Sequence, residues 1–407
     1  MKIVFFVENN RAGGMDSFFI NVINNWPSEE DDIFLICNES HPGLANIKDG
    51  IIRKIEFIDI DLPLNWTIAE KYFGWLPDIM RRATQPIIKI ILFPYQLAKL
   101  KKLFLRLDAD RLMVVNGAYP GGESCRAATI AWARIGKVLS IHNIRNFAIK
   151  PRWLISWYEN WIDEKLFESI SCFVGVSKSC TKSLKLRPKF KDHSKLIHIY
   201  NGTPIKKNPK SIQHPISLRK TLKIGNKPMC LMLATYELRK GHKFIFEVFR
   251  RVNSVEPDAQ LVICGDGSKK EKHTVNQMRK SIASDSNIHL LDFIANGRDL
   301  ISQADILVVP SQEWESFGWT VIEAMTRNIP VVSTNSGGLA EVVGPNGIAG
   351  YSIDPHDHKA FSDAIINLLQ NPTLRKEISN AGYKRVVEHF NVERMAREYS
   401  ELIRLDL

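Results

Sequence analysis

Two successive series of short apolar segments, separated by helix-like stretches, constrain the fold of this chain more than any other feature. Val, Ile and Leu run through these segments without the polar alternation of a half-exposed strand, which is typical of parallel strands buried on both faces. Two such series predict an α/β fold of two Rossmann-like domains. The segments are KIVFFVE (2–8), DIFLICN (32–38), RLMVVN (111–116), VLSIHN (138–143) and CFVGVS (172–177), then PMCLMLAT (228–235), QLVICGDG (260–267), IHLLDF (288–293), DILVVPS (305–311) and PVVSTN (330–335).

The boundary between the two domains is predicted within NGTPIKKNPKSIQHP (201–215), which is rich in Pro, Lys, Asn and Ser and lacks periodicity. We therefore expect an N-terminal domain over 1–203 and a C-terminal domain over 204–387. A chain of 407 residues exceeds the size at which a single core stops growing. Ligands of open parallel sheets bind outside the carboxyl ends of the strands, so the loops that follow the apolar segments are where function is expected.

Charge and targeting signals narrow the environment of the protein. The formal net charge is +11, which favours an anionic partner: nucleic acid, an anionic membrane surface or a phosphorylated substrate. The six cysteines form no CxxC pair, as expected of buried thiols in a reducing compartment. MKIVFFVENN resembles a first strand rather than a signal peptide, and no uncharged apolar run reaches 18 residues. The expected location is cytoplasmic.

Two segments that are both basic and apolar could contact a membrane or pack in the core. Residues 81–107 combine Lys and Arg with Ile, Leu and Phe and contain little acid, and 146–161 add Trp and Tyr. Such a composition fits contact with an anionic membrane surface, peripheral on its inner face. It fits equally an amphipathic helix that packs in the core and extends its lysines to water. The sequence does not choose between these alternatives.

The segment after the apolar run 305–311 carries the clearest functional signal. It reads QEWESFGWTVIEAMTRNIPVVSTNSGG, with Glu315 in a loop, Gly318 at a turn and a helix predicted from about Trp319 to Arg327. A helix start attracts phosphate, and carboxylates accept hydrogen bonds from sugar hydroxyls. Glu315 and Glu323 could thus hold a donor sugar and a ribose. Taken alone, two glutamates at this spacing could also be solvated residues beside an amphipathic helix.

ESFGWTVIEA, followed by IPVVSTNSGGLAEVV, resembles the Glu-x7-Glu segment of the retaining family-4 glycosyltransferases. The resemblance implies the GT-B architecture, in which two Rossmann-like domains face each other across a cleft and a C-terminal helix, here about 388–407, crosses back to the first domain. It also implies that Glu315 contacts the transferred sugar and Glu323 the ribose. The backbone amides around Phe317, Gly318 and Trp319 would hold phosphate.

Shorter matches extend the resemblance along the second domain. LATYELRKGH (233–242) is similar to a family segment whose basic residues neutralise the diphosphate, which implies this role for Lys240 and Arg239. Thr235 stands where most members have Arg. Gly265 follows a strand and lies near the nucleotide by resemblance, or simply forms a tight turn. Phe293 and Ile294 are implied to lie beside the base.

Two matches fall in the first domain. RAGGMDSFFINVI (11–23) resembles the family's glycine loop, in which Gly13 and Gly14 would let the backbone approach a diphosphate or an acceptor. VLSIHNIRN places His142 at the predicted carboxyl end of a strand, where the family histidine hydrogen-bonds the donor sugar. The expected catalytic residues are thus His142, Lys240 and Glu315.

The resemblance implies a hexosyltransferase that moves a sugar, with retention, from a UDP- or GDP-linked donor to a hydroxyl acceptor. A lipid-linked or polysaccharide glycan of bacterial surface polysaccharide synthesis is the expected acceptor. We expect no metal, because the Asp-x-Asp matches at 59–61 and 108–110 lie far from the donor motif. We also expect no nucleic acid, because the second domain does not interleave basic and aromatic residues. A nucleotide-sugar epimerase or a phosphorylase on the same scaffold, or a basic nucleic-acid-binding protein, remain the alternatives.

Overall fold

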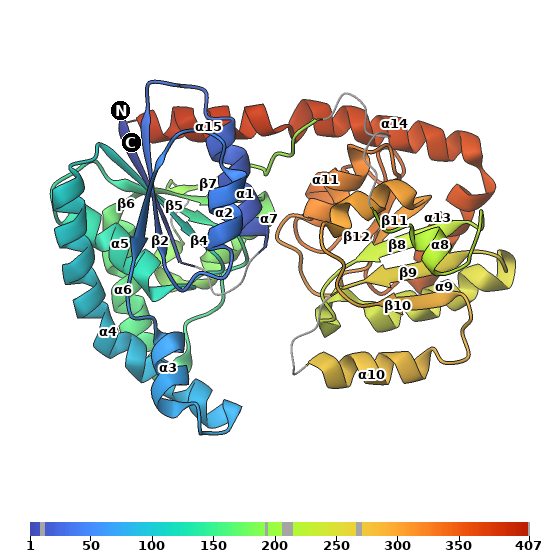
Figure 1. Ribbon diagram of the computed structural model, residues 1–407, viewed down its shortest axis with the longest axis horizontal. Helices are drawn as coiled ribbons and strands as arrows, with labels where there is room; N and C mark the ends of the chain where they lie inside the picture. The colour runs from blue at the N-terminus through green and yellow to red at the C-terminus, as the bar shows by residue number, and fades with distance from the viewer. Residues whose placement is uncertain (9–12, 192–193, 206–214, 266–270, 406–407) are drawn as a thin grey trace. The chain divides into compact units, whose positions relative to one another are not determined.

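The computed structural model describes residues 1–8, 13–191, 194–205, 215–265 and 271–405. The chain divides into two compact units (Figure 1). Unit 1 comprises Met1–Gly202 together with Val392–Leu407, and unit 2 comprises Thr203–Asn391.

Unit 1 is built on a seven-stranded sheet whose neighbouring strands all pair in parallel, in the order β3-β2-β1-β4-β5-β6-β7. The order reverses between β1 and β4, as in a doubly wound Rossmann sheet. The strands are β1 (Lys2–Val7), β2 (Asp32–Asn38), β3 (Glu56–Ile60), β4 (Arg111–Asn116), β5 (Ser140–Ile144), β6 (Ile170–Gly175) and β7 (Leu196–His198). Its helices are α1 (Gly14–Asn24), α2 (Leu44–Gly50), α3 (Asn65–Phe73), α4 (Asp78–Leu107), α5 (Glu123–Ala133), η1 (Trp153–Ile155), α6 (Ser156–Ser169), α7 (Lys178–Ser183), η2 (Leu184–Leu186), η3 (Pro188–Phe190) and α15 (Val392–Arg404).

The last helix, α15, completes the core of unit 1 although nearly two hundred residues separate it from the rest of the unit in sequence. Its apolar face includes Met395, Tyr399 and Ile403, which are buried with the side chains of β1 and α1. The Tyr399 ring lies 5.3 Å from that of Phe18, and its hydroxyl accepts a hydrogen bond of 2.7 Å from Asn143 Nδ2. The predicted return of the C-terminal helix to the first unit is confirmed.

Unit 2 has a six-stranded parallel sheet in the order β10-β9-β8-β11-β12-β13. The predicted fold class, α/β with two Rossmann-like units, is therefore confirmed. The strands are β8 (Met229–Leu233), β9 (Gln260–Cys264), β10 (Ile288–Leu291), β11 (Ile306–Val309), β12 (Val331–Thr334) and β13 (Tyr351–Ile353). The helices are α8 (Leu218–Thr221), η5 (Leu238–Lys240), α9 (His242–Val255), α10 (Glu271–Ser281), η6 (Gly297–Gln303), α11 (Trp319–Met325), α12 (Leu339–Val343), α13 (His358–Gln370) and α14 (Pro372–His389).

Residues 81–107, for which membrane contact and core packing were the two alternatives, lie in helix α4. One face of this 30-residue helix is buried and carries Ile88, Phe93, Leu100 and Phe104 together with Lys89 and Gln96. Other positions, among them Ile87 and Ile91, are exposed. The helix packs in unit 1 and still presents apolar side chains to water. Among the described residues, no helix combines the length and the apolar character needed to cross a membrane.

Candidate functional site

The predicted donor residues of unit 2 converge on the carboxyl edge of its sheet. A cavity of about 160 Å³ lies there, between the ends of β8 and β11 and the start of α11. Lys240, Glu315, Gly318 and Trp319 line it, together with residues of the two strands. Ser311 at the end of β11 is tied to β12, since its carbonyl accepts hydrogen bonds from Thr334 Oγ1 and Ser336 Oγ. The cavity thus has a floor of paired strands and a wall of charged side chains.

Lys240 and Glu315 meet in this cavity although 75 residues separate them. Lys240 Nζ donates a hydrogen bond to Glu315 Oε2, and each side chain is only 17% exposed. Opposite charges held together at the edge of a parallel sheet present both a cation for phosphate and an acceptor for sugar hydroxyls. The structure therefore brings together two of the three residues predicted to be catalytic.

Arg239 lies beside this pair but is held mainly by other groups. Its Nε donates to Glu237 Oε2 at 2.6 Å, its guanidinium lies 4.5 Å from the centre of the Trp314 ring, and Glu315 is 3.9 Å away. Glu237 and Trp314 were not predicted as site residues, although both stand next to motif residues in ELRK and EWE. They position Arg239 against the loop that carries Glu315.

Gly241 lets the loop that carries Lys240 pass close to β11. Its φ is +80°, a left-handed conformation, and a Cβ there would lie 1.9 Å from the carbonyl oxygen of Pro310. Helix α9 begins at the next residue. Only glycine satisfies both the backbone conformation and the close approach, so Gly241 determines where Lys240 lies.

Replacement of Gly241 by alanine is expected to destabilise unit 2 by about 1–3 kcal/mol, because the methyl group forces the backbone away from Pro310. Thermal unfolding of the variant measures this cost. Gly225 is a matched control, since it also has a positive φ of +57° but has no atom within 4 Å of an added Cβ. Equal melting temperatures for Gly241→Ala and Gly225→Ala would contradict the close approach.

The turn before α11 is built as the motif predicted, but the helix is shorter. Gly318 has a φ of +102°, and a Cβ on it would lie 2.6 Å from Leu339 Cδ2. The helix ends at Met325 instead of Arg327, because Asn328 adopts a left-handed φ of 54° ahead of Pro330. Phe317 is buried and packs its ring against Phe390, 5.7 Å away. Its side chain therefore anchors the turn in the core of unit 2.

Trp319 and Thr320 on α11 line the cavity. Glu323 follows them by four and three positions, so it lies on the side of the helix that faces the cavity. Burial raises its pKa to about 7, against the opposing effect of Arg298 and Arg327. Arg327 pairs with Asp299 at 3.0 Å. Among the described residues, none forms a hydrogen bond or an ion pair with the Glu323 carboxylate. This carboxylate retains its capacity to accept hydrogen bonds.

The remaining donor-side predictions lie along the same sheet edge. Gly265 follows β9, and a Cβ there would lie 2.0 Å from the carbonyl oxygen of Ala234. This packing accounts for the glycine without a ligand. Phe293 and Ile294 follow β10, and the Phe293 side chain is 68% exposed. Whether the two contact a base stays a prediction.

In unit 1, Gly13 and Gly14 lie at the start of α1, while residues 11 and 12, the first two of the motif, are outside the described part of the chain. Asp16, two residues after Gly14, has a clear structural task. Its Oδ2 accepts a hydrogen bond of 2.8 Å from the Gly13 N–H, and its Oδ1 lies 2.9 Å from His41 Nε2. Asp16 thereby fixes the glycine turn.

His142 lies in the middle of β5, not at its carboxyl end as predicted, and its side chain is fully buried. Its Nδ1 is 2.9 Å from Thr129 Oγ1, and Asn116 Nδ2 is 3.5 Å from its Nε2. Burial, with a smaller effect of the Arg126 charge, lowers its pKa to about 3, so the imidazole is neutral. In this conformation no surface of His142 is available to a donor sugar, and its predicted catalytic role gains no support from its position.

The carboxyl edge of unit 1 carries an acid that the sequence patterns did not single out. Glu8 follows β1 and is 7% exposed. Its carboxylate accepts a hydrogen bond of 2.9 Å from the Ser124 backbone N–H, and burial raises its pKa. A Cβ on Gly122 would lie 2.7 Å from this carboxylate. Only its place at the end of an apolar strand could have indicated it.

Neither Asp-x-Asp segment shows metal-site geometry. Asp59 lies in β3 and pairs with Lys48, Asp108 pairs with Lys137 at 2.7 Å, and Asp110 Oδ2 accepts the Lys2 N–H at 2.8 Å. Within the described ranges, no three His, Cys, Asp or Glu side chains are grouped so as to hold a metal ion. The six cysteines are buried and free.

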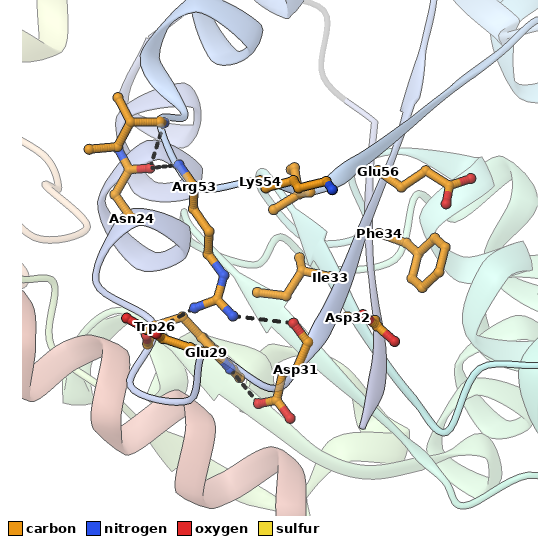
Figure 2. A pocket seen from close by; sticks show the side chains of 12 residues that line it. Asn24, Trp26, Glu29, Asp31, Asp32, Ile33, Phe34, Arg53, Lys54 and Glu56 are labelled. Carbon is orange, nitrogen blue, oxygen red and sulfur yellow. Dashed lines mark hydrogen bonds between the residues drawn. The ribbon is translucent and has the colours of Figure 1, made fainter.

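A larger hollow of about 990 Å³ lies elsewhere, at the amino ends of β2 and β3 (Figure 2). Arg53 crosses it and donates hydrogen bonds to the carbonyls of Trp26, Ser28 and Asp31. Trp26 Nε1 in turn donates to Asp31 Oδ2 at 2.8 Å. Its size does not make it the functional site, because the side chains of Arg53, Trp26 and Asp31 are engaged with neighbouring protein groups and parallel sheets bind ligands at the opposite edge.

Comparisons with known proteins agree with this geometry. Residues 215–385 match the family model described as "Glycosyl transferases group 1", and the whole match lies in unit 2. Sucrose synthase from Acidithiobacillus caldus is 29% identical over 208 residues, which are 46% of this chain and 26% of that protein. N-acetyl-alpha-D-glucosaminyl L-malate synthase from Bacillus anthracis is 27% identical over 181 residues, 41% of this chain and 46% of the relative.

These two matches thus span less than half the length of either relative. The structural likeness extends over the whole chain. The crystal structure of Anabaena Alr3699/HepE in complex with UDP has a TM-score of 0.74 and 16% identity, and the alignment covers 99% of each chain. At this identity the likeness shows the fold alone.

Proposed function

We propose that this protein is a glycosyltransferase that transfers a sugar from a nucleoside diphosphate sugar to a hydroxyl acceptor. The observation that carries the proposal is the Lys240–Glu315 pair in the cavity at the carboxyl edge of the unit 2 sheet. The family match to the same unit supports it, as do the names of the relatives. UDP is the proposed nucleotide, because the similar Anabaena structure holds UDP.

Four of the predicted residues have proposed roles that fit their surroundings. Lys240 neutralises the diphosphate, and Glu315 accepts hydrogen bonds from hydroxyls of the transferred sugar. Glu323 accepts hydrogen bonds from the ribose, for which a carboxylate that no described residue hydrogen-bonds is suited. Arg239, which Glu237 and Trp314 hold 3.9 Å from Glu315, adds positive charge to the diphosphate side.

The proposed reaction breaks the bond between the anomeric carbon and the leaving phosphate oxygen and forms a bond from that carbon to the acceptor oxygen. The leaving diphosphate takes the acceptor proton, and the new bond forms on the same face, so that configuration is retained. Electrostatic stabilisation of the diphosphate supplies most of the catalysis in this scheme. We propose a glycan acceptor, lipid-linked or polymeric, of bacterial surface polysaccharide synthesis, and a reaction without metal.

Nucleotide-dependent thermal stabilisation tests the donor site. UDP at about 100 times its dissociation constant should add about 2.7 kcal/mol to the stability of unit 2, and GDP, CDP and ADP should add less. Glu323→Gln should abolish the difference, whereas Glu377→Gln, an exposed acid on α14, should keep it. Absence of a shift with all four nucleotides, or an unchanged shift in Glu323→Gln, would contradict the assignment. Conversion of a UDP-sugar into its epimer without transfer would favour the epimerase alternative.

The raised pKa of Glu323 predicts a pH dependence in two measurements. Nucleotide affinity should fall about tenfold between pH 8 and pH 6, because a ribose hydroxyl binds the ionised carboxylate and the protonated fraction grows below pH 7. The folding stability of the protein without nucleotide should instead decrease as the pH rises. The native carboxyl keeps a proton that the unfolded chain loses above about pH 4.5, so stability decreases as pH rises from 4.5 to 7.

Titration calorimetry with UDP and thermal unfolding without it, at each pH, measure both trends. In Glu323→Gln, both slopes should flatten, and the variant without ligand should be more stable than the wild type at pH 8. If affinity and stability depend on pH in Glu323→Gln as they do in the wild type, a group other than Glu323 causes the pH dependence.

A further inference from the structure

Large apolar side chains are exposed along two segments of unit 1. In α4 and the turn before it, Trp75 and Ile79 are 81% and 84% exposed, and Ile87 and Ile91 are more than 60% exposed. In η1 and α6, Trp153 is 82% and Trp157 66% exposed. Isolated surface apolar residues are ordinary, but a gathering of this size marks an interaction site. We call Trp75, Ile79, Ile87, Ile91, Trp153 and Trp157 the docking surface.

The two segments are neighbours in the fold. Phe93 on α4 lies 6.3 Å, between ring centres, from both Tyr158 and Trp161 on α6. Both segments also follow carboxyl ends of sheet strands: α3 begins five residues after β3 ends, and η1 follows β5. Figure 1 shows α3 and the beginning of α4 extending as an arm from unit 1. The part of the docking surface that contains Trp75, Ile79 and Trp153 thus follows the carboxyl edge, where ligands of a parallel sheet bind.

The same stretch of chain as the α4 part of the docking surface is rich in exposed cations. Residues 70–107 place seven Lys and Arg side chains in contact with water (Lys71, Arg81, Arg82, Lys99, Lys101, Lys102 and Arg106) against two acids, Glu70 and Asp78. Arg81 pairs with both acids, so the remaining cations meet no acidic side chain of α3 or α4. Lys71 and Arg82 line one hollow of about 600 Å³ between α3 and α4.

We propose that the docking surface binds an anionic lipid bilayer. Trp suits the headgroup level of a membrane, Ile suits the acyl boundary, and Lys and Arg bind the anionic headgroups. A protein partner fits less well, because protein interfaces are depleted in Lys. Nucleic acid fits less well too, since aliphatic Ile offers no ring on which bases stack.

Docking in this manner places the carboxyl edge of unit 1 at the membrane. If the proposed glycosyl transfer is correct, the acceptor is then an amphiphile whose hydroxyl group projects from the bilayer next to that edge. This clause rests on the proposed function, whereas the docking itself does not.

Vesicle co-sedimentation of the full chain tests the docking. The protein should bind phosphatidylcholine vesicles that contain phosphatidylglycerol, bind vesicles of phosphatidylcholine alone far more weakly, and dissociate as salt is raised. Trp75→Ser with Ile79→Ser should weaken binding about tenfold, through lost apolar burial. Lys71→Gln with Arg82→Gln should weaken it by roughly fivefold for each cation removed.

Matched controls lie on other surfaces. Ile52→Ser removes an isoleucine that is 87% exposed at the amino edge of unit 1, and Lys359→Gln with Lys384→Gln removes two exposed cations of unit 2. These variants should bind vesicles as the wild type does. UDP-dependent stabilisation, measured on every variant, should stay unchanged, which separates failure of the docking from failure of the donor site.

Three outcomes would overturn the proposal. The wild type could ignore both kinds of vesicle at low salt. The Trp75 and Ile79 variant could bind vesicles as the Ile52 control does. The docking-surface variants could instead convert an oligomer to a monomer or abolish RNA binding while vesicle binding persists, which would assign the surface to a second copy of the chain or to nucleic acid.

Discussion

Replacing Lys240 with methionine is expected to lower the rate at which a UDP-sugar releases UDP by two to three orders of magnitude. Lys240 is the cation that the structure places in the cavity with Glu315, and loss of one preorganised charge that stabilises a leaving group costs about 10²–10³ in rate. The stability of the free protein should change by less than about 1 kcal/mol, because the pair is partly exposed and the surrounding water screens its charges.

The measurement is a UDP-release assay with the UDP-sugar that stabilises the wild type most, with thermal unfolding in parallel. Lys243→Met is the matched control, since Lys243 lies three residues further along on α9 and is exposed. It should keep wild-type turnover. Turnover of Lys240→Met within threefold of the wild type, in a folded protein, would remove Lys240 from the catalytic residues.

The largest effect on stability is expected from Arg187→Met. The Arg187 side chain is fully buried, and its Nε and Nη1 donate to Asp163 Oδ2 at 2.7 Å and Glu159 Oε2 at 2.8 Å. The Tyr119 hydroxyl donates to the other oxygen of Asp163 at 2.6 Å. Methionine leaves two buried carboxylates with too few partners, and breaking a buried pair in this way costs about 3–5 kcal/mol.

Lys189→Met provides the comparison for this variant. Lys189 lies two residues away and pairs at 2.7 Å with Glu164, which belongs to the same helix α6, but both side chains are more than 40% exposed. Loss of this surface pair should cost less than about 1 kcal/mol. Thermal unfolding measures the stability of both variants. If Arg187→Met melts at the same temperature as Lys189→Met, the buried network does not hold α6 to the rest of unit 1.

The fold was largely predictable because buried parallel strands leave a strong local signal. Each of the ten apolar segments overlaps a strand of the structure. The strands that the patterns missed, β3, β7 and β13, lie at sheet edges, where most residues are only partly buried and the continuous apolar run is lost. The end of α11 was misplaced by two residues, since the left-handed Asn328 gives a weaker stop signal than a glycine would.

The candidate site was predictable where a short segment carries its own geometry. Glu315, Gly318 and Glu323 belong to one continuous loop and helix, and the resemblance of this segment to a family motif indicated a shared site, whereas the spacing of the glutamates alone did not. His142 shows the limit of this reasoning. A strand residue can face a sheet edge or the interior, and the side chains that enclose His142, Thr129 on α5 and Asn116 on β4, come from elements that its own segment does not describe.

The alternation of strands and helices and the presence of two units could be predicted from the sequence, because both depend on local periodicity, and the two glutamates were indicated by the resemblance of their segment to a family motif. The tertiary structure decided everything that depends on groups distant in sequence. In the folded chain Lys240 hydrogen-bonds Glu315, and Gly241 packs against the carbonyl of Pro310. Burial raises the pKa of Glu323 and encloses His142. The physical reason is that charge pairing, close packing and desolvation act through space between side chains that the fold alone makes neighbours.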